Sequence, residues 1–314
     1  MTGAPRQIVE AIDVCYMGLK GAAYAFLIHG LDGNVLVETG PAATQKILMA
    51  GLVQHGVVAQ DIRHVLLTHI HLDHAGAAGH FAKLGAEIHV HPFGDRHLVD
   101  PTKLISSSRR VHAELFERFY GEPLPIPQAQ IDAMDDGSER ILCGLKFRAL
   151  HTPGHARHHI VWLLDHAGDR HAFMGDLGGI LIPDSECIAI PMPPPEFDPH
   201  AWIHSLRRVI AESPTYVWLT HGACVATNQV SSRAFLQRAM DRVEQETTWL
   251  RELTASQHDE AHTLAAYQSL VLSVAASAGV RPQQQKAFLD EAFFRMNLSG
   301  ARRAFGMSPP TNKL

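Results

Sequence analysis

The six-residue segment 69–74, with the sequence HIHLDH, constrains this chain more than any other feature, because four of its side chains can bind metal. An apolar run precedes it and small residues follow it, which predicts a buried strand, a sharp turn and then a helix. In an extended turn, side chains two positions apart project to the same side, so His69 and His71 can hold one cation. Asp73 and His74 point elsewhere and can hold a second. Imidazole and carboxylate ligands suit zinc, with iron and manganese as alternatives.

Three further candidate ligands follow predicted strands downstream. They are His155 after the strand 146–150, Asp176 after the strand 172–174 and His221 after the strand 216–219. Side chains just beyond strand ends are typical of binding sites on layered α/β scaffolds. In a chain with 22 histidines, one histidine pair would say little, but this combined pattern favours a metal site over scattered histidines.

The HxHxDH motif, followed in order by a histidine, an aspartate and a histidine, resembles the metallo-β-lactamase-fold hydrolase superfamily over roughly residues 8–225. The resemblance implies an α/β fold, an αββα sandwich of two mixed β-sheets flanked by helices. It also implies two divalent metal ions, with zinc expected. The implied ligands are His69, His71 and His155 for the first metal, Asp73, His74 and His221 for the second, and Asp176 as the bridge between them.

A dinuclear centre of this kind predicts a hydrolase. Two divalent cations about 3.5–4 Å apart can share a bridging water and make it a hydroxide near neutral pH. The hydroxide would attack a carbonyl or phosphoryl centre, and Asp73 would be the catalytic residue that accepts its proton and passes it to the leaving group. Metal-bound imidazoles also need a partner for their other nitrogen, for which Glu38, Thr68 and Asp61 are candidates.

The ligand set narrows the choice of substrate. One β-lactamase class has a cysteine where Asp176 stands and another lacks the bridging aspartate, flavodiiron proteins have a glutamate at His71, and the stretch 177–220 is too short for a nuclease-specific domain. The remaining relatives resemble glyoxalase II-like thioesterases, N-acyl lactone hydrolases and related esterases. We therefore expect an ester, thioester or lactone of a small molecule as the substrate.

Other reaction classes stay open at this point. A mononuclear iron enzyme resembling the persulfide dioxygenases would use His69, His155 and Asp176 in a two-histidine, one-carboxylate arrangement. A phosphodiester hydrolase and a non-catalytic binding protein on the same scaffold are further alternatives.

Composition limits the partners and the location. A chain of 314 residues that is 46% hydrophobic can bury a large core, and its formal charge of −5 gives no electrostatic case for nucleic acid. The sequence has no uninterrupted apolar run long enough to span a membrane and no signal-peptide pattern in residues 1–10. Four widely spaced cysteines without a CxxC motif fit a reduced compartment. We expect a cytoplasmic enzyme with a small-molecule substrate.

The order of predicted elements indicates one large domain with two additions. Residues 1–250 are expected to form the metallo-β-lactamase-like domain, with a helical insertion near 92–137, and residues 251–314 a helical C-terminal extension. The insertion is expected to lie over the metal site, where its candidate substrate contacts are His97, Lys103, Ser106 and Tyr120. The extension could be a helical cap or a homodimer contact.

Overall fold

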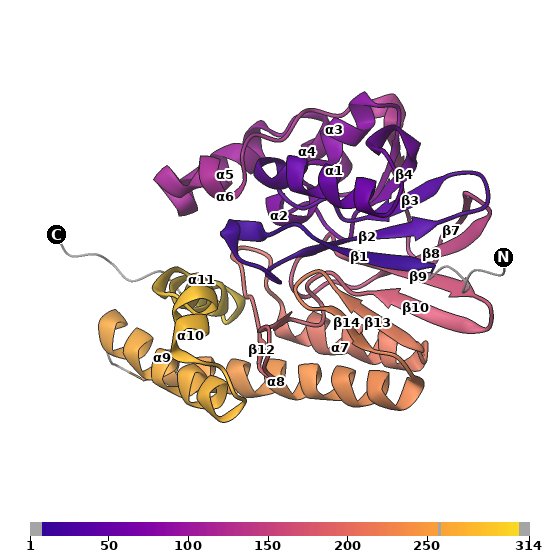
Figure 1. Ribbon diagram of the computed structural model, residues 1–314. Coiled ribbons are helices and arrows are strands. Elements are labelled where there is room, and N and C mark those ends of the chain that lie inside the picture. The colour runs from indigo at the N-terminus through magenta and orange to yellow at the C-terminus, as the bar shows by residue number, and fades with distance from the viewer. Residues whose placement is uncertain (1–7, 257–258, 308–314) are drawn as a thin grey trace.

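The computed structural model describes residues 8–256 and 259–307, which form four layers in the order helices, sheet, sheet, helices (Figure 1). This arrangement confirms the predicted αββα sandwich. The first six-stranded sheet has the strand order β1-β2-β3-β4-β5-β6. Its strands are β1 (Val9–Asp13), β2 (Tyr24–His29), β3 (Asn34–Val37), β4 (Ile62–Leu66), β5 (Glu87–Val90) and β6 (Ile131–Ala133).

The second six-stranded sheet has the order β14-β13-β10-β9-β8-β7 and packs on the first. Its strands are β7 (Glu139–Leu142), β8 (Leu145–His151), β9 (Ile160–His166), β10 (Asp169–Phe173), β13 (Tyr216–Leu219) and β14 (Ala223–Ala226). A small ribbon of β11 (Ile180–Leu181) and β12 (Ile188–Ala189) lies within the proline-rich loop after Asp176.

Helices cover the outer face of each sheet (Figure 1). Over the first sheet lie α1 (Gln45–Gln54), α2 (Leu72–Ala75), α3 (Ala78–Lys83), α4 (Asp95–Val99), α5 (Thr102–His112) and α6 (Phe116–Phe119). Over the second lie α7 (Pro199–Ala211) and α8 (Gln229–Ala255), followed by α9 (Glu260–Ser277), α10 (Pro282–Phe288) and α11 (Glu291–Ala304). Short 3-10 helices connect these elements, namely η1 (Tyr16–Gly18), η2 (Ala42–Thr44), η3 (Ala59–Asp61), η4 (Ala113–Leu115) and η5 (Gln128–Gln130).

The strand β2 shows why the central strands read as apolar runs in the sequence. Phe26 and Ile28 point into the core between the sheets, whereas Ala25 and Leu27 point into the core under the helices. Successive side chains of a strand alternate between faces, and both faces of this sheet are covered. Each position of such a strand is therefore apolar, and the alternation that marks a half-exposed strand is missing.

The C-terminal helices share a core with the second sheet. Tyr267 of α9 and Phe294 of α11 belong to the same buried cluster as Trp202 of α7 and Leu236 of α8. The helix α8 runs without interruption through residue 250, where the sequence suggested a domain boundary. The helical character of the C-terminal region is confirmed, while the boundary itself stays a prediction.

The insertion 92–137 differs from the sequence prediction at its end. It contains α4, α5 and α6, but β6 (Ile131–Ala133) then pairs in parallel with β5 and forms the edge of the first sheet. A three-residue edge strand has too few positions to show a periodic pattern, which is why it was predicted within a helical segment.

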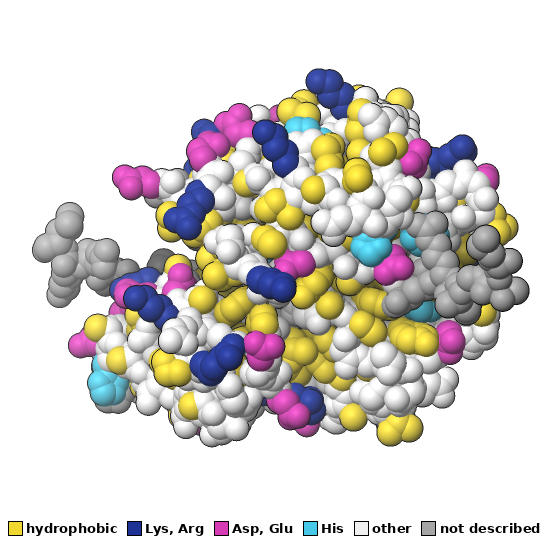
Figure 2. Space-filling view, in the orientation of Figure 1, with side chains coloured by type: hydrophobic (Ala, Val, Ile, Leu, Met, Phe, Trp, Pro, Cys, Tyr) yellow, Lys and Arg dark blue, Asp and Glu magenta, His cyan; other side chains and the backbone are white. Residues whose placement is uncertain are grey.

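Two observations bear on nucleic-acid and membrane partners. Lys and Arg side chains are interspersed with Asp and Glu on the face shown in Figure 2. Among the described residues, no helix has both the length and the apolar character needed to cross a bilayer.

Candidate metal centre

The loop between β4 and α2 turns the HIHLDH segment so that its side chains face in two directions. His71 is the N-cap of α2 and has extended backbone angles, φ −61° and ψ 149°. His69 therefore precedes the helix, whereas Asp73 and His74 lie in its first turn. Helical and extended backbone direct neighbouring side chains differently, so one short segment supplies ligands to two positions.

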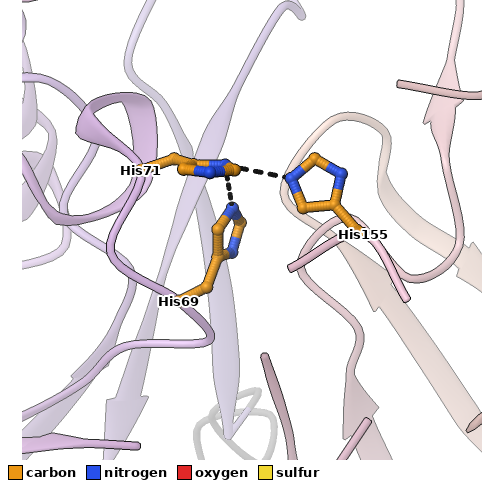
Figure 3. Close-up of side chains that lie close together, drawn as sticks. All are labelled: His69, His71 and His155. Atoms are coloured by element: carbon orange, nitrogen blue, oxygen red, sulfur yellow. Dashed lines mark hydrogen bonds between the residues drawn. The ribbon is translucent and has the colours of Figure 1, made fainter. Parts of the chain in front are cut away.

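The first group consists of three histidines from both halves of the fold. Nε2 of His69 and Nε2 of His155 each lie 3.0 Å from Nδ1 of His71. Figure 3 shows these ring nitrogens pointing toward one another, with His69 and His71 from one side and His155 from the other. Gly154 allows this approach, because a Cβ at that position would lie 2.3 Å from Cα of Trp202 in α7.

The second group consists of Asp73, His74 and His221. Oδ2 of Asp73 lies 3.6 Å from Nε2 of His221 and 3.9 Å from Nε2 of His74. The three ligand atoms lie within 4.8 Å of one another, as they do in the first group.

Asp176 lies between the two groups and offers one carboxylate oxygen to each. Its Oδ1 is 3.2 Å from Nε2 of His74 and 3.4 Å from Nε2 of His221. Its Oδ2 is 3.2 Å from Nε2 of His155. The structure therefore brings together all seven residues that the sequence singled out.

The outer nitrogens of the histidines have the partners expected around a metal. Nδ1 of His155 donates to the carbonyl of Pro191 at 3.1 Å, and Nδ1 of His221 donates to the carbonyl of Ala22 at 2.6 Å. Nδ1 of His69 is hydrogen-bonded to Oγ1 of Thr68 at 3.0 Å. The bonds to the two carbonyls leave the Nε2 lone pairs of His155 and His221 directed inward, as a metal ligand requires.

Two inward-facing atoms have no hydrogen-bond partner within the described part of the chain. They are Nε2 of His74 and Oδ1 of Asp176, which are buried and lie 3.2 Å apart but are not aligned for a hydrogen bond. A buried polar atom without a partner is costly, and a cation between these atoms would satisfy both. The donor set and its orphaned atoms fit divalent metal ions.

The electrostatics of the group are those of a cation site. Burial lowers the pKa of His69 well below its ordinary value and lowers the pKa of His155 to about 4, so both imidazoles are neutral donors. Burial alone would raise the pKa of Asp176, but the histidines His74, His155 and His221 hold it well below the ordinary carboxyl value. Burial alone would lower the pKa of His74, but the carboxylates Asp176, Glu38 and Asp73 raise it well above its ordinary value, so His74 holds a proton that a metal ion would displace.

Residues behind the ligands hold His74 and Asp176. Glu38 is fully buried in a left-handed backbone conformation (φ 65°), with Oε1 3.5 Å from Nδ1 of His74. It also accepts a hydrogen bond from the backbone N–H of Thr68. Nε2 of His159 accepts from the backbone N–H of Asp176 at 3.2 Å. Asp61, the third candidate from the sequence, lies elsewhere, at the exposed end of η3, where it accepts from the N–H of Val58.

The insertion contributes to the site through a residue that the sequence analysis missed. Phe93, just after β5, stacks on His158 with ring centroids 6.0 Å apart, and His158 lies 6.1 Å from His69. An aromatic residue directly after a strand end was the available signal. Of the four predicted substrate contacts, His97 packs against Phe93, with ring centroids 5.9 Å apart.

The other three predicted substrate contacts are placed differently. Tyr120 is buried against Tyr16, and Tyr16 lies 6.5 Å from His221, so Tyr120 supports the second group from behind. Lys103 and Ser106 lie on the exposed surface of α5. The structure gives these two residues no contact with the seven ligands among the described interactions.

The C-terminal helix α11 is connected to the first group through Asn297. This buried side chain donates to the carbonyl of Ile190 and accepts from the N–H of Met192, both at 2.8 Å. The residue between them is Pro191, whose carbonyl holds His155. No local sequence pattern pointed to Asn297, because its two partners are more than 100 residues away in sequence.

The chain is similar to known proteins in sequence and in fold. A family model described as the metallo-beta-lactamase superfamily matches residues 19–187. The metallo-beta-lactamase fold-containing protein ST1585 of Sulfurisphaera tokodaii is 29% identical over 167 residues, which cover 52% of this chain and 61% of that protein. The Bacillus subtilis protein named probable metallo-hydrolase YqjP is 25% identical over 268 residues, which cover 78% of this chain and 80% of that protein.

Solved structures show the same fold over nearly the whole chain. The crystal structure of ST1585 superposes with a TM-score of 0.65 at 18% identity and covers 95% of this chain and 99% of that one. The family protein TTHA1429 from Thermus thermophilus superposes with a TM-score of 0.64 at 22% identity, covering 96% of this chain and 95% of that one. The fold, including the C-terminal helices, is therefore shared.

Proposed function

The chain belongs to the metallo-beta-lactamase superfamily, and we propose that it is a two-metal hydrolase that cleaves an ester, thioester or lactone bond of a small molecule. The observation that carries the proposal is the position of Asp176, whose two carboxylate oxygens are directed to two separate histidine groups. A single-metal site would need only one of these groups. Relatives named as probable metallo-hydrolases support the reaction class.

The residues that would hold the metals follow from the geometry. His69, His71 and His155 would bind the first ion, and Asp73, His74 and His221 the second, with Asp176 shared by both. Zinc is the expected metal, because imidazole and carboxylate ligands suit it. Two such ions supply Lewis-acid polarisation of a carbonyl and a water that is acidic near neutral pH.

Asp73 is the residue that we propose for proton transfer. Its side chain is 19% exposed, compared with 6% for Asp176, so it lies on the more open side of the centre. One of its oxygens faces His74 and His221, and the carboxylate can still reach a water or a leaving group. A carboxylate in this position can accept a proton from the attacking water and return it to the departing oxygen, nitrogen or sulfur.

The first test measures the metal content of the protein and then its activity on a panel of substrates. Freshly purified protein is analysed for zinc, iron and manganese, and then assayed against small esters, thioesters and lactones before and after removal of metal by a chelator. We expect at least two zinc ions per chain and a hydrolase activity that disappears with the metal and returns with zinc. A single iron ion and oxygen consumption with persulfides would replace the proposal by the dioxygenase alternative.

A variant at the bridge makes the test specific. Asp176→Asn keeps the shape of the side chain but removes the charge shared by the two groups, so it should lose activity together with at least one metal ion. The matched control is His204→Gln on α7, which removes an exposed histidine that is not among the seven candidate ligands. Full activity and an unchanged metal content in Asp176→Asn would contradict the bridging role of Asp176.

A further inference from the structure

A second group of metal-binding side chains lies outside the seven-residue centre, on strands β4 and β5. It consists of His64, Glu87 and His89, which we call the strand cluster. Nδ1 of His64 lies 3.1 Å from Nε2 of His89 and 3.4 Å from Oε2 of Glu87. Nε2 of His89 lies 3.6 Å from the same carboxylate oxygen. Three ligand atoms therefore face one another.

The parallel register of the two strands brings these side chains to one face of the sheet. His64 pairs with Glu87, and Leu66, two residues further along β4, pairs with His89. Side chains two positions apart on a strand share a face, so Glu87 and His89 lie beside each other, with His64 opposite. The arrangement depends on regular strands, which hold it more rigidly than loops would.

The spacing of the three atoms is that of a zinc site. Zinc binds imidazole nitrogen and carboxylate oxygen at about 2.0–2.2 Å in a tetrahedron, which places the ligand atoms about 3.3–3.5 Å apart. The observed separations, 3.1 to 3.6 Å, bracket that value. The side chains need to move only by tenths of an ångström to bind an ion.

A carboxylate behind the cluster fixes the orientation of His89. Nδ1 of His89 donates to Oδ2 of Asp132 on β6 at 3.1 Å, so its Nε2 carries the lone pair that faces the cluster. Arg140 of β7 in turn holds Asp132 through two nitrogens at 2.8 and 3.0 Å. A carboxylate that accepts the outer N–H of a histidine is the usual support of a histidine that binds metal.

The cluster is open on one side. The side chain of His89 is 1% exposed, that of His64 is 20% exposed and that of Glu87 is 47% exposed. Three protein ligands with an open fourth position leave room for a water molecule. Two imidazole nitrogens and one carboxylate oxygen are donor types that suit a zinc ion.

We propose that the strand cluster is a zinc site with three protein ligands and one water, separate from the seven-residue centre, and that the bound ion ties β4 to β5. The tie would act close to the candidate metal centre. The backbone N–H of Leu67 donates to the carbonyl of His89, and the carbonyl of Leu67 accepts from Nε1 of Trp162. Leu67 lies two residues before His69, so an ion on the strand cluster stabilises the strand end from which the ligand loop begins.

The test counts zinc in four forms of the full-length protein. Wild type, His64→Gln, Glu87→Gln and the control His204→Gln are stripped with a chelator and dialysed against zinc chloride, and bound zinc per chain is measured by elemental analysis. We expect His64→Gln and Glu87→Gln to bind one ion fewer than the other two proteins. Equal counts in all four proteins would overturn the proposal, as would the same loss in His204→Gln.

This result does not depend on the proposed hydrolase function. The four proteins share an intact seven-residue centre, so a difference of one ion reports on the strand cluster whatever that centre holds. The two proposals can therefore fail separately.

Two further measurements test the orientation of His89 by Asp132 and the link that the bound ion makes between β4 and β5. Asp132→Asn should weaken zinc binding at the cluster by about 10- to 100-fold without abolishing it, because it removes only the support of His89. Unchanged affinity would contradict the orientation by Asp132. Added zinc should raise the unfolding temperature of the stripped wild type and of His204→Gln more than that of His64→Gln. An equal rise in all three would contradict the tie between β4 and β5.

Discussion

The seven-residue centre and the strand cluster begin from the same strand, β4, but the chain assembles them in different ways. The centre takes its candidate ligands from α2 and from loops that follow strand ends in both halves of the sandwich, and all of them except His71 and Asp73 are buried. The strand cluster takes its ligands from within two adjacent strands of one sheet and is open on one side. The first therefore depends on the packing of the two sheets, and the second on the register of a single strand pair.

The two sites should also differ in how rigid their side chains are when no metal ion is bound. In the strand cluster, the hydrogen bonds among His64, His89 and Asp132 satisfy the polar atoms before any ion binds. In the seven-residue centre, buried atoms of His74 and Asp176 have no such partners among the described residues. Metal removal should therefore disturb the centre more than the cluster.

The largest expected effect is at the second group of the centre. His74→Ala should lower hydrolytic activity by more than about 100-fold, because even the outer partners of metal ligands contribute 10- to 100-fold. The first group, with His69, His71 and His155, should keep its ion. Activity on the substrate found by the panel and metal per chain are measured together. Loss of both ions with collapse of the fold would show that the centre is also structural, and would weaken the contrast with the strand cluster.

An intermediate effect is expected from the C-terminal helix. Asn297→Ala removes the two bonds that hold the backbone on either side of Pro191, so metal affinity at the first group should fall by about 10- to 100-fold. The control is Tyr267→Phe, which removes bonds to Glu246 and Asn297 in the same buried network but leaves the loop bonds in place. It should cost stability of about 1–3 kcal/mol but leave metal affinity unchanged. Equal affinity losses in both variants would show a general loss of packing.

The smallest expected effect concerns the strand cluster without metal. The hydrogen bond from His89 and the pairing with Arg140 lower the pKa of Asp132 from 3.8 to about 2. A folded-state pKa below the unfolded value adds stability above the unfolded value, and this stability is lost as the pH falls toward 2. In zinc-free protein, Asp132→Asn should therefore cost about 1–2 kcal/mol at neutral pH.

Denaturant unfolding between pH 7 and pH 3 checks this value. The gap between wild type and Asp132→Asn should narrow below pH 4. Asp165→Asn is the control, because Asp165 also pairs with an arginine, Arg170, but is half exposed and should show a smaller gap. A gap that stays constant with pH would mean that the charge of Asp132 does not hold the cluster.

The αββα fold was predicted through the family resemblance that the HIHLDH segment carries, while the apolar runs predicted only individual strands. Strands such as β2 and β9 are continuous apolar runs, and the helix α7 begins at Pro199 behind the N-cap Asp198, so their positions were clear. The short edge strands β6 and β14 were missed. An edge strand of three or four residues is stabilised by its neighbour in the sheet, and that neighbour cannot be identified from local sequence.

The two candidate metal sites differ in how far the sequence predicts them. Four of the seven ligands of the centre lie within six residues of sequence, and the other three follow recognisable strands. The strand cluster has no such motif, because His64 meets Glu87 and His89 only through the parallel pairing of β4 and β5. The Glu-x-His spacing of residues 87 and 89 on a predicted strand was the one local signal. Register is a tertiary property, and a single sequence does not encode it in a readable form.

The left-handed backbone conformation of Glu38 bears on both the stability and the activity of the protein. A non-glycine residue in that conformation costs about 1–2 kcal/mol, which glycine would avoid. Glycine, however, would remove the only carboxylate described within 3.5 Å of Nδ1 of His74. Glycine would also leave the buried N–H of Thr68 without its acceptor, at about 1–3 kcal/mol. A screen for heat resistance should therefore gain little from Glu38→Gly, and a screen for turnover should reject it.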